Sequence, residues 1–401
     1  MFRFLHCADL HLGSPFAAWR KLRPAEAKAL ALAPYAVFDR LADLAAEHGA
    51  RFVVLAGDVF DTSEPSLYAA ARFRATLEKL GQKGVRVFWA AGNHDWGAER
   101  EGLPVNTTRF SAEKAECFSV TDANGKTVAS VAGISHAAPD ERNDLAPAVD
   151  AALAGAPGFR IGVLHANVDG DPGHEPYAPV PLAELASGHA DYWALGHIHR
   201  RRVLCERPFA VYAGSPQGRS VGEPGPRGAV LVEVDDAGRA TPRMLDAQLF
   251  RFETLTLDLR EVGDVAALEA AFRKALPDIR TPLYLRLVLA GGTPLNARLR
   301  AAGNEELEEL FSSVLRSECR HAALESVIVR TTAPLSAARR EGLAAEVAAV
   351  RGEVDPARLL AALPLSPGEF SGFDEAELSE IKREAEELLL DCLSGESEAG
   401  R

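Results

Sequence analysis

The chain has 401 residues, of which 47% are hydrophobic and 25% are charged, and its formal net charge is −13. The length predicts two or three domains, and the composition is that of a globular protein rather than a collagen-like or low-complexity chain. The net charge argues against general attraction to nucleic acid or anionic lipid. Residues 336–401 hold 15 acidic and 7 basic side chains, a net of −8, so a basic groove elsewhere is compatible with the sequence.

The 5 cysteines are far apart and form no C-x-x-C pair, which argues against a disulfide framework or a thiolate zinc site and favours a reducing compartment. The opening sequence, MFRFLHCADLHLG, is too short an apolar stretch for a signal peptide, because His6 and Asp9 interrupt it. No run reaches the ~18–20 apolar residues of a membrane span. We therefore expect a cytoplasmic protein with no membrane contact.

Short apolar runs alternate with helical stretches over the first 235 residues, which is the α/β pattern. Helices are expected at Pro24–His48 and Ser66–Leu80, each followed by a glycine. Strands are expected at Phe2–Ala8, Arg51–Ala56, Val85–Ala90, Val128–Ala132, Arg160–Leu164, Asp191–Leu195, Phe209–Ala213 and Ala229–Val234.

The pattern changes after a turn at residues 234–239. It then predicts, in order, a strand, a helix, a strand, a helix and a strand at Phe250–Leu259, Val265–Leu276, Pro282–Leu289, Glu305–Arg320 and Leu324–Thr331. We interpret the chain as three parts: residues 1–240, a small α+β domain at 250–335, and a helical acidic tail at 336–401 that ends in a helix at Asp374–Leu393.

Five of the predicted strands are followed at once by Asp, Asn or His. These residues fall in D-x-H at 9–11, GDVFD at 57–61, GNHD at 92–95, a single histidine at 165 and GHIH at 196–199. Binding crevices of α/β sheets form at the carboxyl ends of the strands, so we expect these side chains to meet. The candidate metal ligands are Asp9, His11, Asp58, Asn93, His165, His197 and His199.

The donor types point to a particular chemistry. Asp, Asn and His without Cys suit Mn²⁺, Fe²⁺ or Zn²⁺. Seven donors exceed the needs of one ion and suit two ions about 3.5–4 Å apart that share a carboxylate, an arrangement that clamps phosphoryl oxygens. Each short motif alone is more often an ordinary polar strand end, and only their combination carries the prediction. The histidines outside it are interpreted as structural or surface residues.

Together these motifs resemble those of the calcineurin-like metallophosphoesterase superfamily. Within it, residues 6–16, 57–66 and 92–96 are similar to SbcD-like DNA repair exonucleases, and the YhaO-like branch matches best. The resemblance covers roughly residues 2–235, and the 250–335 block matches the capping domain of that family by position and size. It implies a two-sheet β-sandwich flanked by helices, with a small α+β capping domain and a helical C-terminal tail, and phosphodiester cleavage in DNA with Mn²⁺.

The resemblance also implies roles for individual residues. One metal ion would be held by Asp9, His11, Asp58 and His199, and the other by Asp58, Asn93, His165 and His197, with Asp58 bridging. His94 would contact the phosphate or protonate the leaving oxygen. We add the hypothesis that Asp61 orients His94 and raises its pKa.

The metal site by itself implies a phosphoester substrate and not DNA. Protein phosphatases of the superfamily have Arg-Gly after GDxxD and Glu after GNH, where this chain has Thr62-Ser63 and Asp95. Candidate contacts to DNA phosphates are Arg200, Arg201, Arg202 and Arg219, although solvated strand exits explain them equally well. The alternatives are an enzyme for small phosphodiesters or nucleotides and a non-catalytic scaffold that regulates an ATPase. The scaffold is disfavoured because all seven ligand positions and His94 are present.

The tail offers a partner signal. Apolar residues of the last helix recur at 3-4-3-4 spacing, at Leu378, Ile381, Ala385, Leu388 and Cys392. SbcD-like nucleases bind the coiled-coil root of an SMC-like ATPase through C-terminal helices, so the resemblance implies an SbcC-like partner, DNA and a homodimer. The alternative is that this helix packs on its own capping domain. The sequence leaves open the cleavage polarity, the strand preference and the native metal.

Overall fold

The computed structural model describes residues 1–14, 24–98, 101–171, 173, 175–279, 281–319 and 321–334. The predicted tail helix and its partner-binding role lie outside these residues. The chain divides into two compact units, one of Met1–Glu253 with Arg280–Tyr284, and one of Thr254–Ile279 with the chain from Leu285 onward. Within the described ranges, no helix combines the length and the apolar character needed to cross a bilayer.

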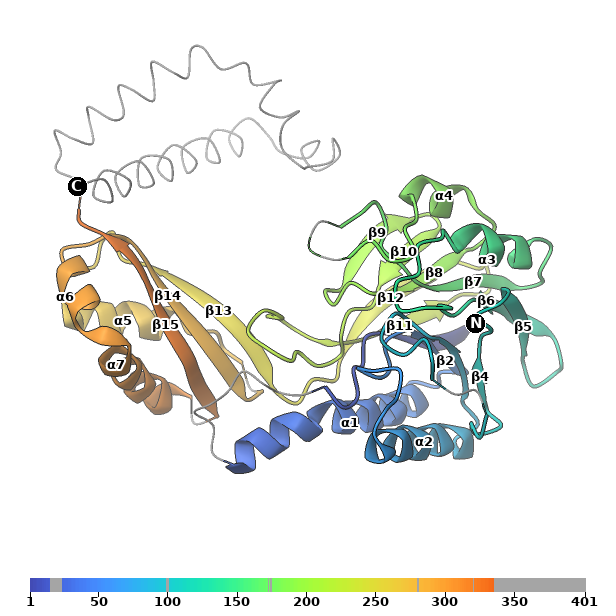
Figure 1. Ribbon diagram of the computed structural model, residues 1–401, viewed down its shortest axis with the longest axis horizontal. Coiled ribbons are helices and arrows are strands. Elements are labelled where there is room, and N and C mark those ends of the chain that lie inside the picture. The colour runs from blue at the N-terminus through green and yellow to red at the C-terminus, as the bar shows by residue number, and fades with distance from the viewer. Residues whose placement is uncertain are drawn as a thin grey trace, which may run out of the picture. The chain divides into compact units, whose positions relative to one another are not determined.

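The first unit contains two six-stranded sheets (Figure 1). The first sheet has the order β12-β11-β1-β2-β3-β4. Its strands are β1 (Phe2–Cys7), β2 (Phe52–Ala56), β3 (Arg86–Ala90), β4 (Thr107–Arg109), β11 (Gly228–Val234) and β12 (Ala240–Asp246). Strands β1, β2 and β3 run parallel to one another. They are buried on both faces, which explains why they read as continuous apolar runs.

The second sheet has the order β5-β6-β7-β8-β10-β9. Its strands are β5 (Glu116–Thr121), β6 (Thr127–Gly133), β7 (Phe159–His165), β8 (Tyr192–Gly196), β9 (Arg202–Glu206) and β10 (Phe209–Tyr212). Strands β7 and β8 are parallel neighbours, with His165 opposite Gly196 in the register. The carboxyl ends of these two strands therefore lie side by side.

Helices cover the outer faces of both sheets (Figure 1). The first sheet packs on α1 (Pro24–Glu47) and α2 (Leu67–Gln82), with Phe38 and Phe73 stacked at 5.6 Å between ring centroids. The Ser66 hydroxyl accepts a hydrogen bond from the Ala69 N–H and caps α2. The second sheet packs on α3 (Ala146–Leu153) and α4 (Leu182–Ser187).

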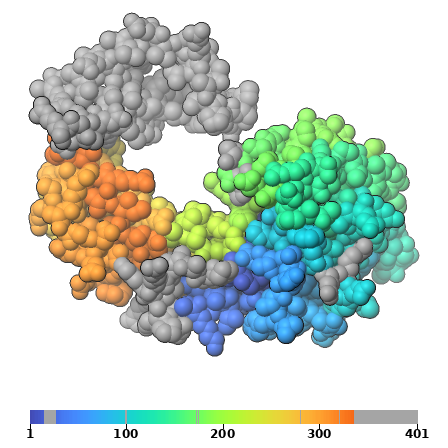
Figure 2. Space-filling view, viewed as in Figure 1, coloured from blue at the N-terminus to red at the C-terminus, as the bar shows by residue number. Residues whose placement is uncertain are grey.

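An aromatic core fills the space between the sheets. Phe4 stacks on Phe52 with ring centroids 5.0 Å apart, and the edge of Tyr192 meets Phe4 at 5.3 Å across the sandwich. Full burial of such a side chain contributes about 1.5–3 kcal/mol to stability. In the space-filling view, the blue, cyan and green segments of the first unit form one packed body (Figure 2). This core holds the two sheets in a fixed relation, so the loops at their edges can form a precise site.

The second unit contains a three-stranded sheet and three helices. The sheet has the order β13-β14-β15, with β13 (Arg251–Asp258), β14 (Leu283–Gly292) and β15 (Ala322–Thr332). The helices are α5 (Val265–Ala275), α6 (Asn296–Ala301) and α7 (Gly303–Glu318). Phe272 of α5 meets Phe311 of α7 edge to face at 5.0 Å. Strand β13 begins in the first unit, at residues 251–253, and continues into the second.

The loop at residues 217–227 is fastened to the start of β13. The Gln217 side-chain amide donates to the Phe250 carbonyl at 3.0 Å and accepts from the Leu249 N–H at 2.9 Å. The Gly225 N–H donates to the Phe252 carbonyl at 3.0 Å. Val221 is buried with Phe250 and Phe252. The loop therefore has a fixed place next to this strand.

The predicted fold class is confirmed: two mixed sheets flanked by helices, with a further sheet and helices after them. The eight strands expected before residue 235 are all present, with ends that differ by one or two residues. The sequence missed β4, β5, β9, β12, α3, α4 and α6. Strand β12 pairs with β11, so the first unit extends past residue 240, where we expected its end.

Candidate metal centre

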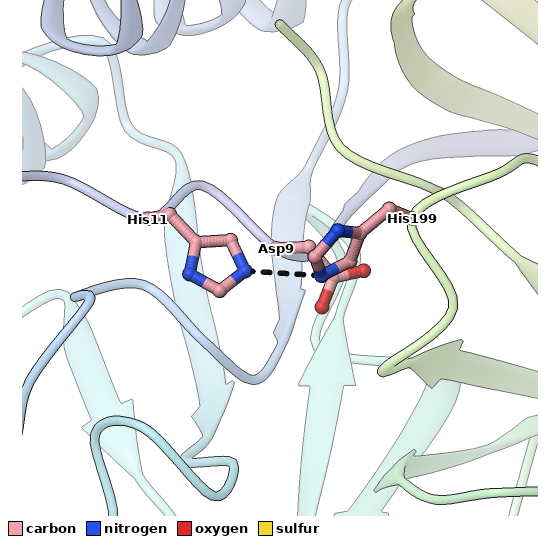
Figure 3. Close-up of side chains that lie close together, drawn as sticks. All are labelled: Asp9, His11 and His199. Carbon is pink, nitrogen blue, oxygen red and sulfur yellow. Dashed lines mark hydrogen bonds between the residues drawn. The ribbon is translucent and has the colours of Figure 1, made fainter. Parts of the chain in front are cut away.

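The candidate ligands come together at the carboxyl ends of five strands. Strands β1, β2 and β3 bring Asp9, His11, Asp58 and Asn93, and strands β7 and β8 of the other sheet bring His165, His197 and His199. Donor atoms of three overlapping groups lie within 4.8 Å of one another: Asp9, His11 and His199; His11, Asp58 and His94; and Asp9, Asp58 and His165. Figure 3 shows the first group, with the His11 and His199 rings facing each other across Asp9.

The backbone at the site is strained. Asp9, His11, Asp58 and His197 all have positive φ angles, of 52°, 44°, 49° and 100°. Such a conformation costs on the order of 1–3 kcal/mol per residue and persists only where the surroundings enforce it. Hydrogen bonds between the loops do so: the Asp9 N–H donates to the Gly57 carbonyl at 3.0 Å, and the His11 N–H to the Asp58 carbonyl at 2.9 Å. Strain concentrated at candidate ligands favours a functional site.

Two glycines of the motifs allow this close packing. A Cβ atom on Gly57 would lie 2.2 Å from Nδ1 of His165, and one on Gly92 would lie 2.4 Å from Oδ1 of Asp58. Real Cβ atoms do not approach other atoms so closely. The glycines of GDVFD and GNHD are therefore required by the side chains of two candidate ligands, as well as by the turn itself at Gly57, where φ is 90°.

Each histidine at the site has one ring nitrogen bound to an oxygen of the chain. Nδ1 of His11 donates to the Asp61 carboxylate at 2.9 Å, and Nδ1 of His199 to the Glu223 carboxylate at 2.8 Å. Backbone carbonyls serve the others: Ala56 for Nδ1 of His165 at 3.0 Å and Glu175 for Nε2 of His197 at 2.9 Å. These bonds fix the tautomers and leave the opposite nitrogens as metal donors.

The opposite nitrogens converge. Nε2 of His11 lies 3.2 Å from Nε2 of His199. Two nitrogens bound to one ion at about 2.0–2.1 Å with a tetrahedral angle are about 3.3 Å apart, so this spacing fits a shared ion. Nε2 of His165 lies 2.9 Å from the Asn93 amide oxygen and 3.4 Å from Oδ2 of Asp58. The His197 ring meets the His165 ring at 5.2 Å between centroids.

The buried carboxylates need a cation. Oδ2 of Asp9 is buried and has no hydrogen-bond partner among the described residues. Burial raises the pKa of Asp58, but His165 and His11 outweigh it and hold that pKa well below its usual range. Burial in turn lowers the pKa of His165, and the Asp58 charge more than reverses this, to about 9. An orphaned carboxylate oxygen and a carboxylate stabilised only by positive neighbours fit divalent cations, with Asp58 between the two groups of donors.

His94 lies beside this cluster, and its contact with Asp61 differs from our hypothesis. Nδ1 of His94 donates to the backbone carbonyl of Asp61 at 3.0 Å, whereas the Asp61 carboxylate turns away to accept from His11. The carboxylate that we expected to orient His94 therefore orients His11, because the buried His11 ring lies directly beside it. Nε2 of His94 lies 4.0 Å from Oδ2 of Asp58, and the side chain is 42% exposed.

The four candidate DNA-binding arginines are not equivalent. Arg219 is only 21% exposed and is bound by Asp61 and Glu223 at 3.4 and 3.0 Å, so it lies among carboxylates instead of on an open surface. Arg202 is 57% exposed and lies 3.4 Å from Asp171. Arg200 is exposed and Arg201 is half-buried.

Sequence reasoning missed several residues that hold the site. The buried Asp95 accepts from the Gly92 N–H at 2.6 Å and the Val59 N–H at 2.7 Å, so it ties two motif loops together. Burial, followed by the Asp58 charge, raises the pKa of Asp95 to about 6. Arg227 donates to the His199 carbonyl. The position of Asp95 directly after GNH is a signal that could have been read, but Glu223 and Arg227 stand in a Gly/Pro-rich loop with no pattern.

A cavity of about 810 Å³ opens at the metal donors. Its walls contain both donors and uncharged side chains. They are Asp58, Thr62, Ser63, Asn93, His94, Trp96, Pro139, Gly173, Glu175, Tyr177, His197 and His199. Trp96 is 36% exposed, whereas one face of the Tyr177 ring is covered by the Arg142 guanidinium at 5.3 Å. The cavity is large enough for more than a phosphate group, and one wall offers an aromatic face.

Comparison with known proteins agrees with this geometry. The family model described as calcineurin-like phosphoesterase matches residues 2–201, and that of the middle domain of metallophosphoesterase YhaO matches residues 252–332. The protein called uncharacterized metallophosphoesterase YhaO of Bacillus subtilis is 33% identical over 323 residues, which are 76% of this chain and 78% of that protein.

Two nuclease relatives match more distantly. The SbcD component of nuclease SbcCD of Escherichia coli K12 is 28% identical over 53% of this chain, and the DNA double-strand break repair protein Mre11 of Methanopyrus kandleri is 28% identical over 59%. The matches span 60% and 55% of the lengths of those two proteins. The matched residues of the family model contain every candidate metal donor described above. The chain therefore belongs to the calcineurin-like metallophosphoesterase family and is a hydrolase of that family, related to the SbcD and Mre11 nucleases.

Proposed function

We propose that this protein is a Mn²⁺-dependent DNA exonuclease and the nuclease subunit of an SbcCD-like DNA repair complex. The observation that carries the proposal is the convergence of seven metal donors on a cavity that also holds His94. The relationship to SbcD and Mre11 favours DNA as the substrate.

The donor set supports two ion positions. One would be formed by Asp9, His11, Asp58 and His199, and the other by Asp58, Asn93, His165 and His197, with Asp58 shared. When bound, two divalent ions clamp the phosphoryl oxygens of a substrate and make a nucleophile from water at neutral pH.

His94 is the proposed catalytic residue among the groups that bind no metal. Its Nδ1–H is held by the Asp61 carbonyl, so Nε2 is directed toward the cavity and Oδ2 of Asp58. A ring held in this way can contact a phosphate oxygen, or donate a proton from Nε2 to the oxygen that leaves phosphorus. Asp61 itself acts on His94 through its backbone, and its carboxylate serves His11.

The walls of the cavity support a nucleotide-sized substrate. Trp96 presents an aromatic face next to His94, and stacking of a nucleobase on an aromatic side chain contributes about 1–3 kcal/mol. Arg200, Arg201 and Arg202 follow the GHIH motif and are the proposed contacts to the DNA backbone. Arg219 is bound by two carboxylates and takes a different role, described below.

Cleavage of end-labelled linear duplex DNA with Mn²⁺ tests the proposal. We compare the wild type with His94→Ala and with His189→Ala, a control that removes an exposed histidine paired with Asp150. Loss of label in the wild type and the control, but not in His94→Ala, is the expected result. No cleavage of DNA, together with His94-dependent hydrolysis of bis(p-nitrophenyl) phosphate, would instead favour an enzyme for small phosphodiesters.

The proposed ATPase partner requires a separate test. We propose that residues 336–401 bind an SbcC-like SMC-family ATPase, as in the family that the sequence resembles. Deletion of residues 370–401 should abolish co-purification with that ATPase and leave hydrolysis of the small diester intact. Loss of folding on deletion would contradict the partner role and favour packing of the tail on the chain itself.

A further inference from the structure

A network of charged side chains joins two of the proposed ligand histidines behind the metal donors. The Asp61 carboxylate accepts from Nδ1 of His11 at 2.9 Å, and the Glu223 carboxylate accepts from Nδ1 of His199 at 2.8 Å. These are the ring nitrogens that face away from the proposed ion. The opposite nitrogens of the two rings face each other at 3.2 Å (Figure 3). The orientation of each ring therefore depends on its carboxylate.

Arg219 lies between these two carboxylates. Its Nη1 is 3.4 Å from Oδ1 of Asp61, and its Nη2 donates to Oε1 of Glu223 at 3.0 Å. Its backbone N–H also donates to Oε2 of Glu223, at 2.8 Å. A planar guanidinium with donors on two nitrogens suits two carboxylates at once, which a single ammonium group does not. Arg219 thus completes a chain of contacts that runs from His11 through Asp61, Arg219 and Glu223 to His199.

The other two ligand histidines are supported differently. Nδ1 of His165 and Nε2 of His197 donate to the backbone carbonyls of Ala56 and Glu175. Backbone carbonyls are neutral, and their positions are set by the strand β2 and by the loop at residue 175. The two proposed ion positions therefore differ in what orients their histidines: side-chain carboxylates joined by one arginine at the first, and backbone at the second.

We propose that Arg219 is a positioning residue for one of the two ions, the one proposed to bind Asp9, His11, Asp58 and His199. The inference rests on the proposed metal centre and goes beyond it, because it assigns to Arg219 a role in metal binding and makes the two ion positions unequal. Arg219 contributes no donor atom to the ion, and its Nη2 meets His199 only at Nδ1, the nitrogen that faces away, at 3.1 Å. It holds Asp61 and Glu223, and these hold the rings of His11 and His199.

The sign of the effect separates this role from simple electrostatics. Removing a positive charge close to a divalent cation strengthens cation binding by Coulomb's law. Losing the support behind two ligand histidines weakens it, typically by about 10–100-fold. Substitution of Arg219 therefore moves the affinity in opposite directions under the two explanations.

Titration with Mn²⁺, followed by electron paramagnetic resonance of the free ion and by isothermal calorimetry, measures both ions without any substrate. The variants are Arg219→Gln, Arg219→Lys and the control Arg202→Gln, which removes the same charge from an exposed side chain whose carboxylate partner is Asp171. In Arg219→Gln we expect one ion to bind about 10–100-fold more weakly and the other to stay within about threefold of the wild type. Arg219→Lys should fall between, and Arg202→Gln should bind both ions normally.

Three results would overturn the inference. They are unchanged or tighter binding of both ions in Arg219→Gln, equal weakening of both, and the same weakening in the Arg202→Gln control. Melting temperatures in EDTA show whether each variant is folded, and Arg219→Lys keeps the charge if the Gln variant is not. Absence of metal binding in the wild type would refute the proposed centre itself, which is seen before any variant is compared.

Discussion

Replacement of Gly92 by alanine tests whether the two faces of the site are as closely packed as described. The added Cβ would stand 2.4 Å from Oδ1 of Asp58 and 2.7 Å from Cδ2 of His165, where ordinary contact begins at 3.4 Å. Relief of the first contact requires a movement of about 1.0 Å, the difference between 3.4 and 2.4 Å. Both neighbours are buried proposed ligands, so neither can swing into solvent.

The size of this movement sets the expected loss. Metal–ligand distances tolerate changes of about ±0.2 Å, so a shift of this size disrupts the site. We expect Mn²⁺ affinity to fall at least ~100-fold, or about 2.7 kcal/mol, and stability to fall by about 1–3 kcal/mol from overpacking. Oδ1 of Asp58 also accepts the His94 N–H at 3.0 Å, so the same shift displaces the proposed catalytic histidine.

Calorimetric titration with Mn²⁺ and thermal melting measure the two effects. The control is Gly263→Ala, because a Cβ there meets nothing within 4 Å and the residue is not in the left-handed region. The control should bind and melt as the wild type does. Wild-type affinity in Gly92→Ala would refute the geometric reasoning, since it would mean that Asp58 and His165 can move without cost to the site.

Three further predictions concern the cavity, the core and the metal. In Trp96→Ala we expect the KM for DNA to rise about 5–150-fold with hydrolysis of bis(p-nitrophenyl) phosphate unchanged, and equal loss on both substrates in steady-state assays would contradict base stacking. Burial lowers the pKa of His6 to about 3, so the unfolded state binds more protons below its pKa of 6.5 and stability is lost as the pH falls from 6.5 toward 3. Urea unfolding should show that His6→Gln removes about 2 kcal/mol of the stability difference between pH 7.5 and pH 5, and an unchanged difference would contradict this assignment. Thermal melting in excess EDTA should show about 2.7 kcal/mol less stability in the first unit than at a Mn²⁺ concentration of 100 Kd, and identical curves would argue against metal binding.

The buried strands and the convergence of the donors could be predicted from the sequence. Strands β1, β2, β3, β7 and β8 are buried, so their apolar runs are continuous, and parallel neighbours bring their carboxyl ends together by necessity. The missed strands β5 and β9 lie at sheet edges and are half-exposed, so their side chains carry no clear pattern. Short runs such as β4 fall below the length at which alternation can be recognised.

The support behind the ligands could not be predicted. Asp61 and Arg219 are 158 positions apart, both in loops, and no spacing rule connects them. The choice of the Asp61 carboxylate between His11 and His94 depends on the loop conformation, which residue order does not specify. This is why the sequence pairs Asp61 with the wrong histidine and assigns Arg219 to DNA, although it identifies the donor positions that the structure brings together.

The fastening of the 217–227 loop to β13 has a mechanical consequence. Arg219 and Glu223 belong to this loop, and its hydrogen bonds to Phe250 and Phe252 hold it to the first residues of a strand that continues into the second unit. A load applied along β13 therefore acts on the same few bonds that orient His199. A protein that grips the second unit would have a lever on the metal centre without approaching the cavity, and tension in one strand would become a difference in ion affinity.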